Sequence, residues 1–265
     1  MTSQISNKEL ECLAPVLSNP DAGSDVLLVC EHASHRMPEA FGHLGLSDDL
    51  RQSHIAWDPG ALGVAQTLSR GLDARLVEAR ASRLCYDCNR PPESPDAIPP
   101  VSEIFEIPGN SDLSAGARAD RVKTFYEPFR ALLAQVAKTS PRPPVIVTVH
   151  SFTPVYRGAP RAVEIGVVHD EDSRLADAML ACAADHTGAN VGRNDPYGPA
   201  QGVTHTLKEH ALSNGFLNVM LEIRNDLITT AAEQEAMGEM LAGWITSALA
   251  SHAIQADPEG RTCQE

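Results

Sequence analysis

Val26-Leu-Leu-Val-Cys-Glu-His-Ala-Ser-His35 is a run of apolar residues that passes into polar ones. A short apolar run bounded by polar residues is typical of a buried strand, which we expect over residues 25–31. In open α/β sheets, ligands bind just beyond the carboxyl ends of such strands, and His32 lies there. The stretch therefore predicts a central strand with a candidate functional histidine at its end.

Two later apolar runs also end in polar side chains. Residues 144–149 form a strongly apolar segment that is followed by His150, and residues 216–223 form another that contains Glu222 near its end. Because the carboxyl ends of parallel strands meet at one edge of a sheet, we expect His32, His150 and Glu222 to converge there.

The remaining pattern alternates between strands and helices. Further strands or extended pieces are expected at residues 74–79, 83–87 and 162–169, and amphipathic helices at 61–72, 114–138, 172–186, 203–211 and 228–252. Alternation of this kind over the whole length is typical of an α/β protein. We therefore predict a single α/β domain with a mostly parallel central sheet flanked by helices.

The domain is expected to occupy residues 24–252. Residues 1–23 end in a turn-forming cluster and are expected to be a lead-in that is at most partly ordered, and residues 253–265 are polar and expected to be a disordered tail. Residues 91–110 are rich in proline and lack periodicity, which predicts a long loop. Long loops in compact domains are usually functional or mobile, so this one is expected to shape specificity.

The composition narrows the class of protein. The 265 residues carry a formal net charge of −14, which argues against nucleic acid or an anionic membrane as a partner. No apolar run is long enough to span a membrane, and the first residues lack a secretory signal pattern. The six cysteines are scattered, which favours free thiols and a cytoplasmic location. The oligomeric state is not predicted by any of these features.

His32 and His150 are the strongest candidate metal ligands among the ten histidines, because each follows a strongly apolar strand. Zinc accepts histidine and carboxylate ligands, and catalytic zinc sites keep an open position. The third ligand is left open between Glu31, His35 and Asp58. On the local pattern alone Asp58 is a helix cap, because it precedes Pro59 and an amphipathic segment.

Polar residues elsewhere suggest further roles. Glu222 and Arg224 lie two apart on a strand and so share a face, either as a structural ion pair or with Glu222 as a general base. Arginine binds carboxylates in two-pronged fashion, so Arg83 and Arg90, with Asn89, suit an acidic substrate, although the local pattern favours a hydrogen-bonded turn. Cys85 and Cys88 form a single C-x-x-C motif, and the chain has no second one. An isolated motif of this kind is only weak evidence for a zinc site or a redox site.

Taken together, five segments resemble the N-formylglutamate amidohydrolase family. No segment is specific alone, but their order is, and the resemblance spans residues 25–250. The segments are Cys30-Glu-His-Ala-Ser, Trp57-Asp-Pro-Gly-Ala, Ser82-Arg-Leu-Cys-Tyr-Asp-Cys-Asn-Arg-Pro, Val149-His-Ser-Phe-Thr-Pro and Leu221-Glu-Ile-Arg-Asn-Asp-Leu-Ile.

This resemblance implies a fold similar to those of zinc carboxypeptidases and aspartoacylases, with one zinc ion per chain. It implies that His32 and His150 are ligands and favours Asp58 as the third, since the carboxypeptidase pattern would place glutamate where this chain has His35. Glu222 would be the general base with Arg224 beside it. Asn89 and Arg90, with Arg83 or Arg224, would bind the substrate carboxylate.

The implied activity is zinc-dependent hydrolysis of a small anionic N-acyl amino acid, such as N-formylglutamate, to glutamate and formate. Two alternatives remain open from the sequence. One is a carboxypeptidase-like hydrolase of a small peptide or cell-wall fragment. The other is a metal-binding or ligand-binding protein that keeps the fold without turnover.

Overall fold

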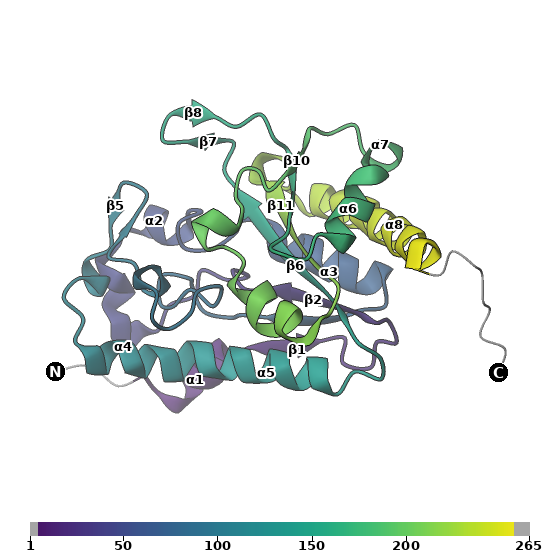
Figure 1. Cartoon of the computed structure of the whole chain (residues 1–265). Helices are drawn as coiled ribbons and strands as arrows, with labels where there is room; N and C mark the ends of the chain where they lie inside the picture. Colours follow the sequence, from purple (N-terminus) through teal and green to yellow (C-terminus); the bar gives the residue numbers. More distant parts are fainter. Residues whose placement is uncertain (1–4, 257–265) are drawn as a thin grey trace.

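The computed structural model describes the backbone of residues 5–256 and the side chains of residues 5–252 (Figure 1). A seven-stranded sheet runs through the centre in the order β1-β3-β2-β6-β11-β9-β10. The strands are β1 (Val16–Ser18), β2 (Val26–Cys30), β3 (Arg75–Glu78), β6 (Val145–Phe152), β9 (Ile165–Val168), β10 (Val191–Arg193) and β11 (Asn218–Arg224). The β3-β2-β6-β11 core is parallel, and β1 and β9 each pair antiparallel with a neighbour. This confirms the predicted α/β domain with a mostly parallel sheet.

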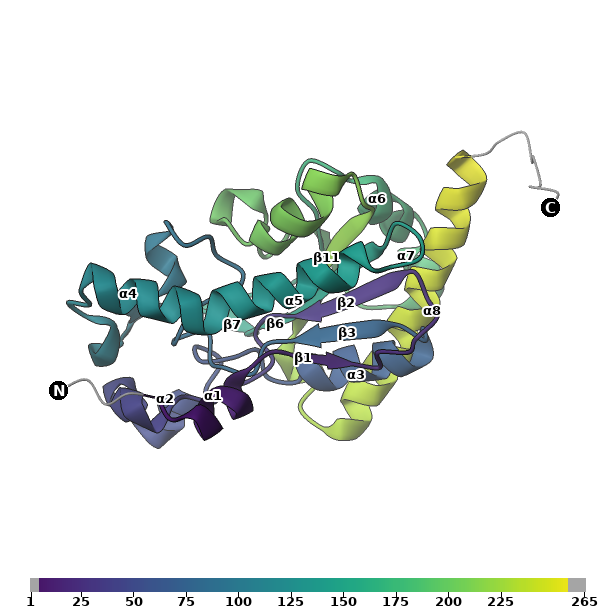
Figure 2. The same ribbon diagram turned by 90° about the horizontal axis from the view of Figure 1, so that it is seen from below.

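Helices cover both faces of this sheet (Figure 2). The long helix α5 lies on one side, and α3 and α8 lie on the other. The helices are α1 (Asn7–Leu13), α2 (Asp48–Gln52), α3 (Ala61–Gly71), α4 (Ala115–Arg121), α5 (Glu127–Lys138), α6 (Arg174–Ala181), α7 (Ala183–His186) and α8 (Ala231–Ala256). None of the helices described is long and apolar enough to cross a membrane.

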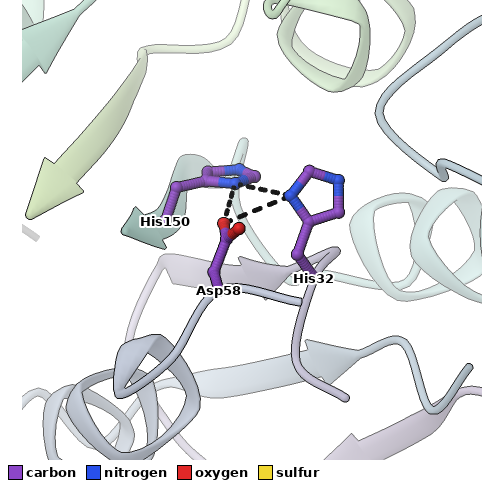
Figure 3. A group of neighbouring side chains, drawn as sticks. All are labelled: His32, Asp58 and His150. Carbon is purple, nitrogen blue, oxygen red and sulfur yellow. Dashed lines mark hydrogen bonds and ion pairs between the residues drawn. The ribbon is translucent and has the colours of Figure 1, made fainter. Parts of the chain in front are cut away.

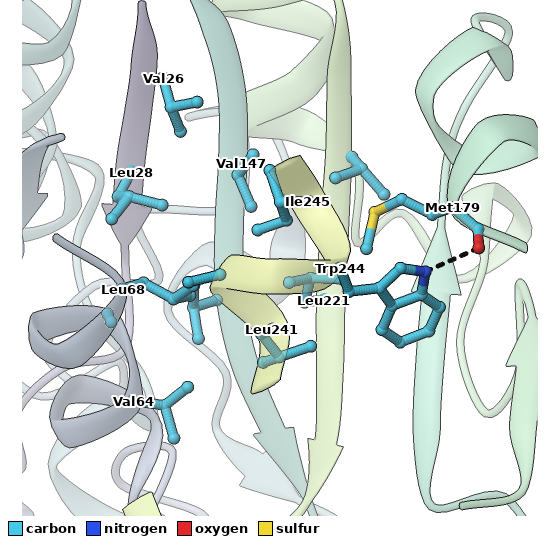
Figure 4. Packing of buried hydrophobic residues seen from close by; sticks show 14 of the residues in the cluster. Val26, Leu28, Val64, Leu68, Val147, Met179, Leu221, Leu241, Trp244 and Ile245 are labelled. Atoms are coloured by element: carbon cyan, nitrogen blue, oxygen red, sulfur yellow. Dashed lines mark hydrogen bonds between the residues drawn. The ribbon is translucent and has the colours of Figure 1, made fainter. Parts of the chain in front are cut away.

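The alternation of side chains along β2 explains the two layers. Leu28 points into the core shared with α3, α6 and α8, whereas Leu27 and Val29 point into the core shared with α5. Figure 4 shows the first of these cores, in which Trp244 is completely buried and donates its indole N–H to the carbonyl of Met179 at 2.7 Å. A strand buried on both faces is apolar at every position, which is why the run beginning at Val26 lacks a polar residue.

Several boundaries differ from the expected ones. The lead-in contains α1 and the edge strand β1, which is paired with β3 and was too short to show a periodicity. No strand forms at residues 83–87, because the backbone N–H of Cys85 bonds to the carbonyl of Ser82 and begins a turn. The final helix continues to Ala256, so residues 253–256 are helical; the rest of the expected tail, 257–265, lies outside the described residues.

Two small hairpins rise from the sheet's carboxyl edge, where the long loops are. The 91–110 loop contains β4 (Val101–Ser102) paired with β5 (Phe105–Glu106). A second hairpin pairs β7 (Val155–Tyr156) with β8 (Ala159–Pro160), directly after β6. The expected helix at 114–138 is interrupted by a π turn over Val122–Tyr126, and the expected short helix at 203–211 is a π turn over Leu207–Ala211.

Gly60 is the residue directly before α3, and its surroundings leave no room for a side chain. Its φ is +82°, and a Cβ there would lie 2.8 Å from Cδ1 of Ile228 and closer still to the Ile228 carbonyl oxygen. We expect Gly60→Ala to lower the free energy of unfolding by about 2–4 kcal/mol, from left-handed strain and overpacking together. Urea unfolding measures this. Gly215→Ala is the control, because Gly215 has a similar φ of +69° but open space around it, and should lose only about 1 kcal/mol. Equal losses in the two variants would contradict the packing argument.

Candidate metal centre and catalytic cavity

His32, Asp58 and His150 converge at the carboxyl end of the sheet (Figure 3). Oδ2 of Asp58 lies 3.2 Å from Nδ1 of His32 and 3.0 Å from Nδ1 of His150, and the two Nδ1 atoms are 3.3 Å apart. All three side chains are buried. Tetrahedral zinc with bonds of about 2.0–2.1 Å separates its ligand atoms by roughly 3.3 Å, so the three atoms have the spacing of three zinc ligands.

The chain holds Asp58 in this position through its backbone and neighbours. The backbone N–H of Asp58 bonds to the carbonyl of His32 at 3.0 Å, which ties the loop to the end of β2. Ser151 contributes twice, because its hydroxyl donates to the Pro59 carbonyl at 2.8 Å and its N–H to Oδ2 of Asp58 at 3.3 Å. The carboxylate makes no cap to α3, whose N-cap is Gly60. Asp58 therefore belongs to the site, contrary to the expectation from the local pattern.

Each imidazole has a carboxylate at its other nitrogen. Nε2 of His32 lies 2.7 Å from Oδ1 of Asp87, and Nε2 of His150 lies 3.1 Å from Oε2 of Glu31. Metal-ligating histidines are typically oriented by a carboxylate in this way, leaving the first nitrogen free for the ion. Glu31 thus lies behind a ligand, and the ring of His35 packs against Trp57 with centroids 5.0 Å apart. Neither is placed as the third ligand.

The electrostatics of the cluster favour a cation. Four carboxylates, those of Glu31, Asp58, Asp87 and Glu222, are buried here beside the two imidazoles, and Arg83 is the guanidinium paired with them, 2.9 Å from Oδ1 of Asp58 and 3.6 Å from Asp87. Burial opposes ionisation of Asp58, but His32 and Arg83 hold its pKa below the ordinary value. Burial opposes protonation of His150, yet Glu31 and Asp58 raise its pKa. Buried negative charge of this kind requires compensation, which a divalent ion would supply.

Glu222 lies on the strand next to His150. The two residues are paired across β11 and β6, and Gly166 of β9 faces Glu222 from the other side, where any Cβ would approach the Glu222 Cβ to 3.1 Å. Burial raises the pKa of Glu222 to about 7. Its Oε2 atom has no hydrogen-bond partner among the residues described. A carboxylate of this kind is suited to accept a proton near neutral pH.

A cavity of about 420 Å³, a size that accommodates a small organic ligand, is lined by His32, Asp58, Asp87, His150 and Glu222. The hairpins β4–β5 and β7–β8 both contribute residues to its walls. A groove of about 1010 Å³ beside α5 contains none of the site residues. The cavity is therefore the candidate substrate site.

The predicted substrate-binding residues are divided by the structure. Arg83, Asn89 and Arg90 all line the cavity. The Asn89 side chain is occupied by backbone groups, donating to Val203 O at 2.5 Å and accepting from Thr206 N at 3.0 Å. Nη1 of Arg90 donates to the carbonyls of Asn89 and Gly202. Asn89 and Arg90 therefore hold the 202–206 segment against the site.

Arg224 is not placed beside the cavity. Its guanidinium lies 2.8 Å from Asp226 and 3.3 Å from Glu164, and it is absent from the residues that line the site. Arg224 is the last residue of β11, two positions beyond Glu222. The two residues share a face of the strand, but Arg224 lies at the end of the strand and outside the cavity lining. Its predicted catalytic role beside Glu222 is therefore corrected to an ion pair at the end of β11.

Two residues of the site had no predicted role. Asp87 was not singled out within its segment, and Tyr197, which lines the cavity, lies in a loop with no motif. Glu31 was predicted only as a possible ligand and not as the carboxylate behind one. The alternation of side chains carried the signal for Glu31, since a neighbour of His32 on a strand end points elsewhere. Cys85 and Cys88 are buried free thiols, and burial raises the pKa of Cys85 to about 12, which makes it unreactive.

The fold and this site define a class: an α/β protein with a buried His-Asp-His cluster and a glutamate at the carboxyl end of its sheet. Residues 24–229 match the family model for N-formylglutamate amidohydrolase. The chain therefore belongs to the N-formylglutamate amidohydrolase family.

Two solved structures support the assignment of the fold. A gene product from Agrobacterium tumefaciens is 52% identical, with a TM-score of 0.90 over 94% of this chain and 99% of that one. The N-formylglutamate amidohydrolase from Ralstonia eutropha JMP134 is 16% identical, with a TM-score of 0.62 over 93% of this chain and 99% of that one. A comparison of the sequence with curated proteins found no match.

Proposed function

We propose that this protein is a zinc-dependent amidohydrolase that cleaves the amide bond of an N-acylated acidic amino acid, in the manner of N-formylglutamate to glutamate and formate. The observation that carries the proposal is the arrangement of His32, Asp58 and His150 at zinc-ligand spacing in the same cavity as Glu222, in a chain of this family. One zinc per chain fits the single cluster of this kind in the described residues.

His32 and His150 would hold the ion through Nδ1, and Asp58 through Oδ2. An ion in such a site supplies Lewis acidity, polarising a carbonyl and making water more acidic near neutral pH. Asp87 and Glu31 keep the two imidazoles in the orientation that presents Nδ1. The protein would therefore supply a preformed set of ligand atoms that binds the ion without rearrangement.

Glu222 would act as general base and then as general acid. Its unpartnered Oε2 accepts a proton from the attacking water and returns it to the leaving nitrogen of the amide. Arg83 has a side chain that is 29% exposed while bonded to Asp58, so it can also face the substrate and stabilise the developing oxyanion. Arg83, Asn89 and Arg90, which all line the cavity, form the substrate-binding side of the site.

The substrate class is tested with a panel of N-acyl amino acids. The purified full-length chain is incubated with N-formyl-L-glutamate, N-formyl-L-leucine, N-acetyl-L-glutamate and a glutamyl dipeptide, and released formate or amine is measured. The proposal predicts the highest kcat/KM for an N-acyl glutamate. Preference for the dipeptide would instead favour the carboxypeptidase-like alternative. We place the reaction in the cytoplasm because the cysteines of the described residues are free.

Removing the carboxylate behind a ligand should weaken metal binding without abolishing it. We expect Asp87→Asn and Glu31→Gln each to lower zinc affinity by about 10–100-fold, because the imidazole loses the group that orients it. Competition with a chromogenic chelator measures the affinity. Asp170→Asn is the control, since Asp170 is also buried but contacts Lys208 and Thr204 instead. Unchanged affinity in both test variants would remove these carboxylates from the metal centre.

A further inference from the structure

Three arginines line the catalytic cavity, and they differ in how they are engaged. Arg83 pairs with Asp58 and Asp87, and Arg90 donates to the carbonyls of Asn89 and Gly202. Arg157 makes neither an ion pair nor a hydrogen bond to any of the residues described; its guanidinium only faces the Tyr156 ring, 5.4 Å from the centroid. Arg157 is therefore the one of these three arginines whose guanidinium donates to no group of the described residues, which leaves all of its N–H groups available to a ligand.

The turn that carries Arg157 has a defined geometry. Arg157 and Gly158 form the two-residue loop of the β7–β8 hairpin, in which Tyr156 pairs with Ala159. Both loop residues have positive φ, +50° and +80°. Positive φ at both central positions is the type I′ turn, which matches the natural twist of a hairpin. The guanidinium is therefore carried on a compact hairpin.

The base of the hairpin is anchored to the cavity wall. The guanidinium of Arg161 lies over the rings of Phe152, Tyr156 and Tyr197, at 5.4, 4.6 and 4.8 Å from their centroids. It also donates to the Tyr197 hydroxyl at 2.8 Å, and its backbone N–H bonds to the Pro154 carbonyl at 2.8 Å. Phe152, Tyr156 and Tyr197 all line the cavity. These contacts attach the base of the hairpin to the cavity wall, and Arg157, in its turn, is exposed and is itself one of the residues that line the cavity.

The charged residues that line the cavity differ between its buried part and its exposed part. Asp96 and Glu103 line the more exposed part of the cavity, and Glu103 is paired with His54. The buried part holds the carboxylates of Asp58, Asp87 and Glu222, and the cation paired with them is Arg83. A substrate carboxylate placed there would meet like charges, whereas at the mouth it would meet Arg157, which is exposed and unpaired. The charge distribution therefore favours binding of a substrate anion at its outer end.

We infer that Arg157 is the specificity-determining residue that binds the carboxylate of the substrate farthest from the scissile amide, the γ-carboxylate of an N-acyl glutamate. This inference rests on the proposed function and names the group that selects its substrate. Because the interaction is present in the bound substrate as well as in the transition state, its loss should raise KM and leave kcat nearly unchanged.

The test compares three substrates with matched variants. N-formyl-L-glutamate carries both carboxylates, N-formyl-L-glutamine lacks the γ-carboxylate, and the α-amide of N-formyl-L-glutamate lacks the α-carboxylate. Arg157→Ala is expected to lower kcat/KM for N-formyl-L-glutamate and for its α-amide by about 10–100-fold, as for a lost charge-assisted hydrogen bond, and to leave N-formyl-L-glutamine within about twofold. Arg157→Lys should recover part of the loss.

Arg142→Ala is the control, because Arg142 is an exposed arginine paired with Asp25 before the start of β6, far along the strand from the cavity. It removes the same charge and should not change the preference between the substrates. Two results would overturn the inference: an equal effect of Arg157→Ala on N-formyl-L-glutamate and N-formyl-L-glutamine, or a loss confined to substrates that keep the α-carboxylate.

The inference and the proposed function fail in different ways. If the wild-type chain hydrolyses none of the three compounds, the proposed function is wrong, and calorimetry of N-formyl-L-glutamate and N-formyl-L-glutamine binding replaces the kinetics. Weaker binding of the glutamate compound alone by Arg157→Ala would still support the site at Arg157. Absent binding, or equal binding of the two compounds by wild type, would overturn it.

Discussion

Replacing Glu222 with glutamine is expected to lower kcat by at least about 10²-fold while zinc content and the unfolding midpoint stay close to those of the wild type. The amide keeps the shape of the side chain but cannot take a proton from water, and a positioned general base typically contributes about 10²–10⁴-fold. Formate release at saturating substrate measures the loss, and elemental analysis of the same preparation measures the metal.

Glu164→Gln is the matched control for this experiment. Glu164 also lies beside β11, where it pairs with Arg224, but it does not line the cavity. Its loss should leave kcat within about twofold of wild type, as expected for a partly exposed ion pair. A fully active Glu222→Gln variant would show that another group moves the proton.

Replacing His150 with alanine is expected to reduce zinc from about one per chain to a small fraction and to abolish hydrolysis. The change removes one of three ligand atoms and leaves Asp58 and Glu31 without the imidazole between them. A two-ligand site of this kind holds zinc far less tightly than a three-ligand one. Equilibrium dialysis followed by elemental analysis measures the bound metal.

The control for this variant is His210→Ala, which removes a histidine that is also buried but lies on the π turn at Leu207–Ala211. Burial lowers the pKa of His210 to about 4, and His210 does not belong to the His32-Asp58-His150 group. This variant should keep its zinc. Stoichiometric zinc in the His150→Ala variant would remove His150 from the centre and with it the ligand set.

The central part of the fold could be predicted because its signal is local. The run beginning at Val26 and the run before His150 are buried on both faces, so their apolar character alone marks them as strands of a parallel sheet. The short edge strands could not be found in this way. Val16–Ser18 and Val191–Arg193 form because a neighbouring strand offers its backbone, which depends on tertiary structure that the sequence does not display.

The candidate site shows the same division. His32, His150 and Glu222 could be located because each follows or ends a buried strand. Asp58 required the resemblance to the family, since its own surroundings resemble a helix cap. Asn89 and Arg90 lie at the cavity as expected, but their side chains are occupied by the backbone of residues 202–206, more than a hundred residues away in sequence. The sequence did not indicate a role for Arg157. Whether this arginine is free to bind a substrate depends on which arginines form ion pairs or hydrogen bonds in the folded chain. The likeness to zinc carboxypeptidases stays a prediction.

The measurement that tests the central claim most directly is formate release from N-formyl-L-glutamate by the full-length chain before and after its metal is removed with a chelator. The account predicts equal amounts of formate and glutamate from the untreated protein, loss of activity on chelation, and recovery when about one zinc ion per chain is returned. Turnover that persists in protein shown to contain no metal would contradict it, as would the absence of turnover in protein that holds one zinc ion per chain.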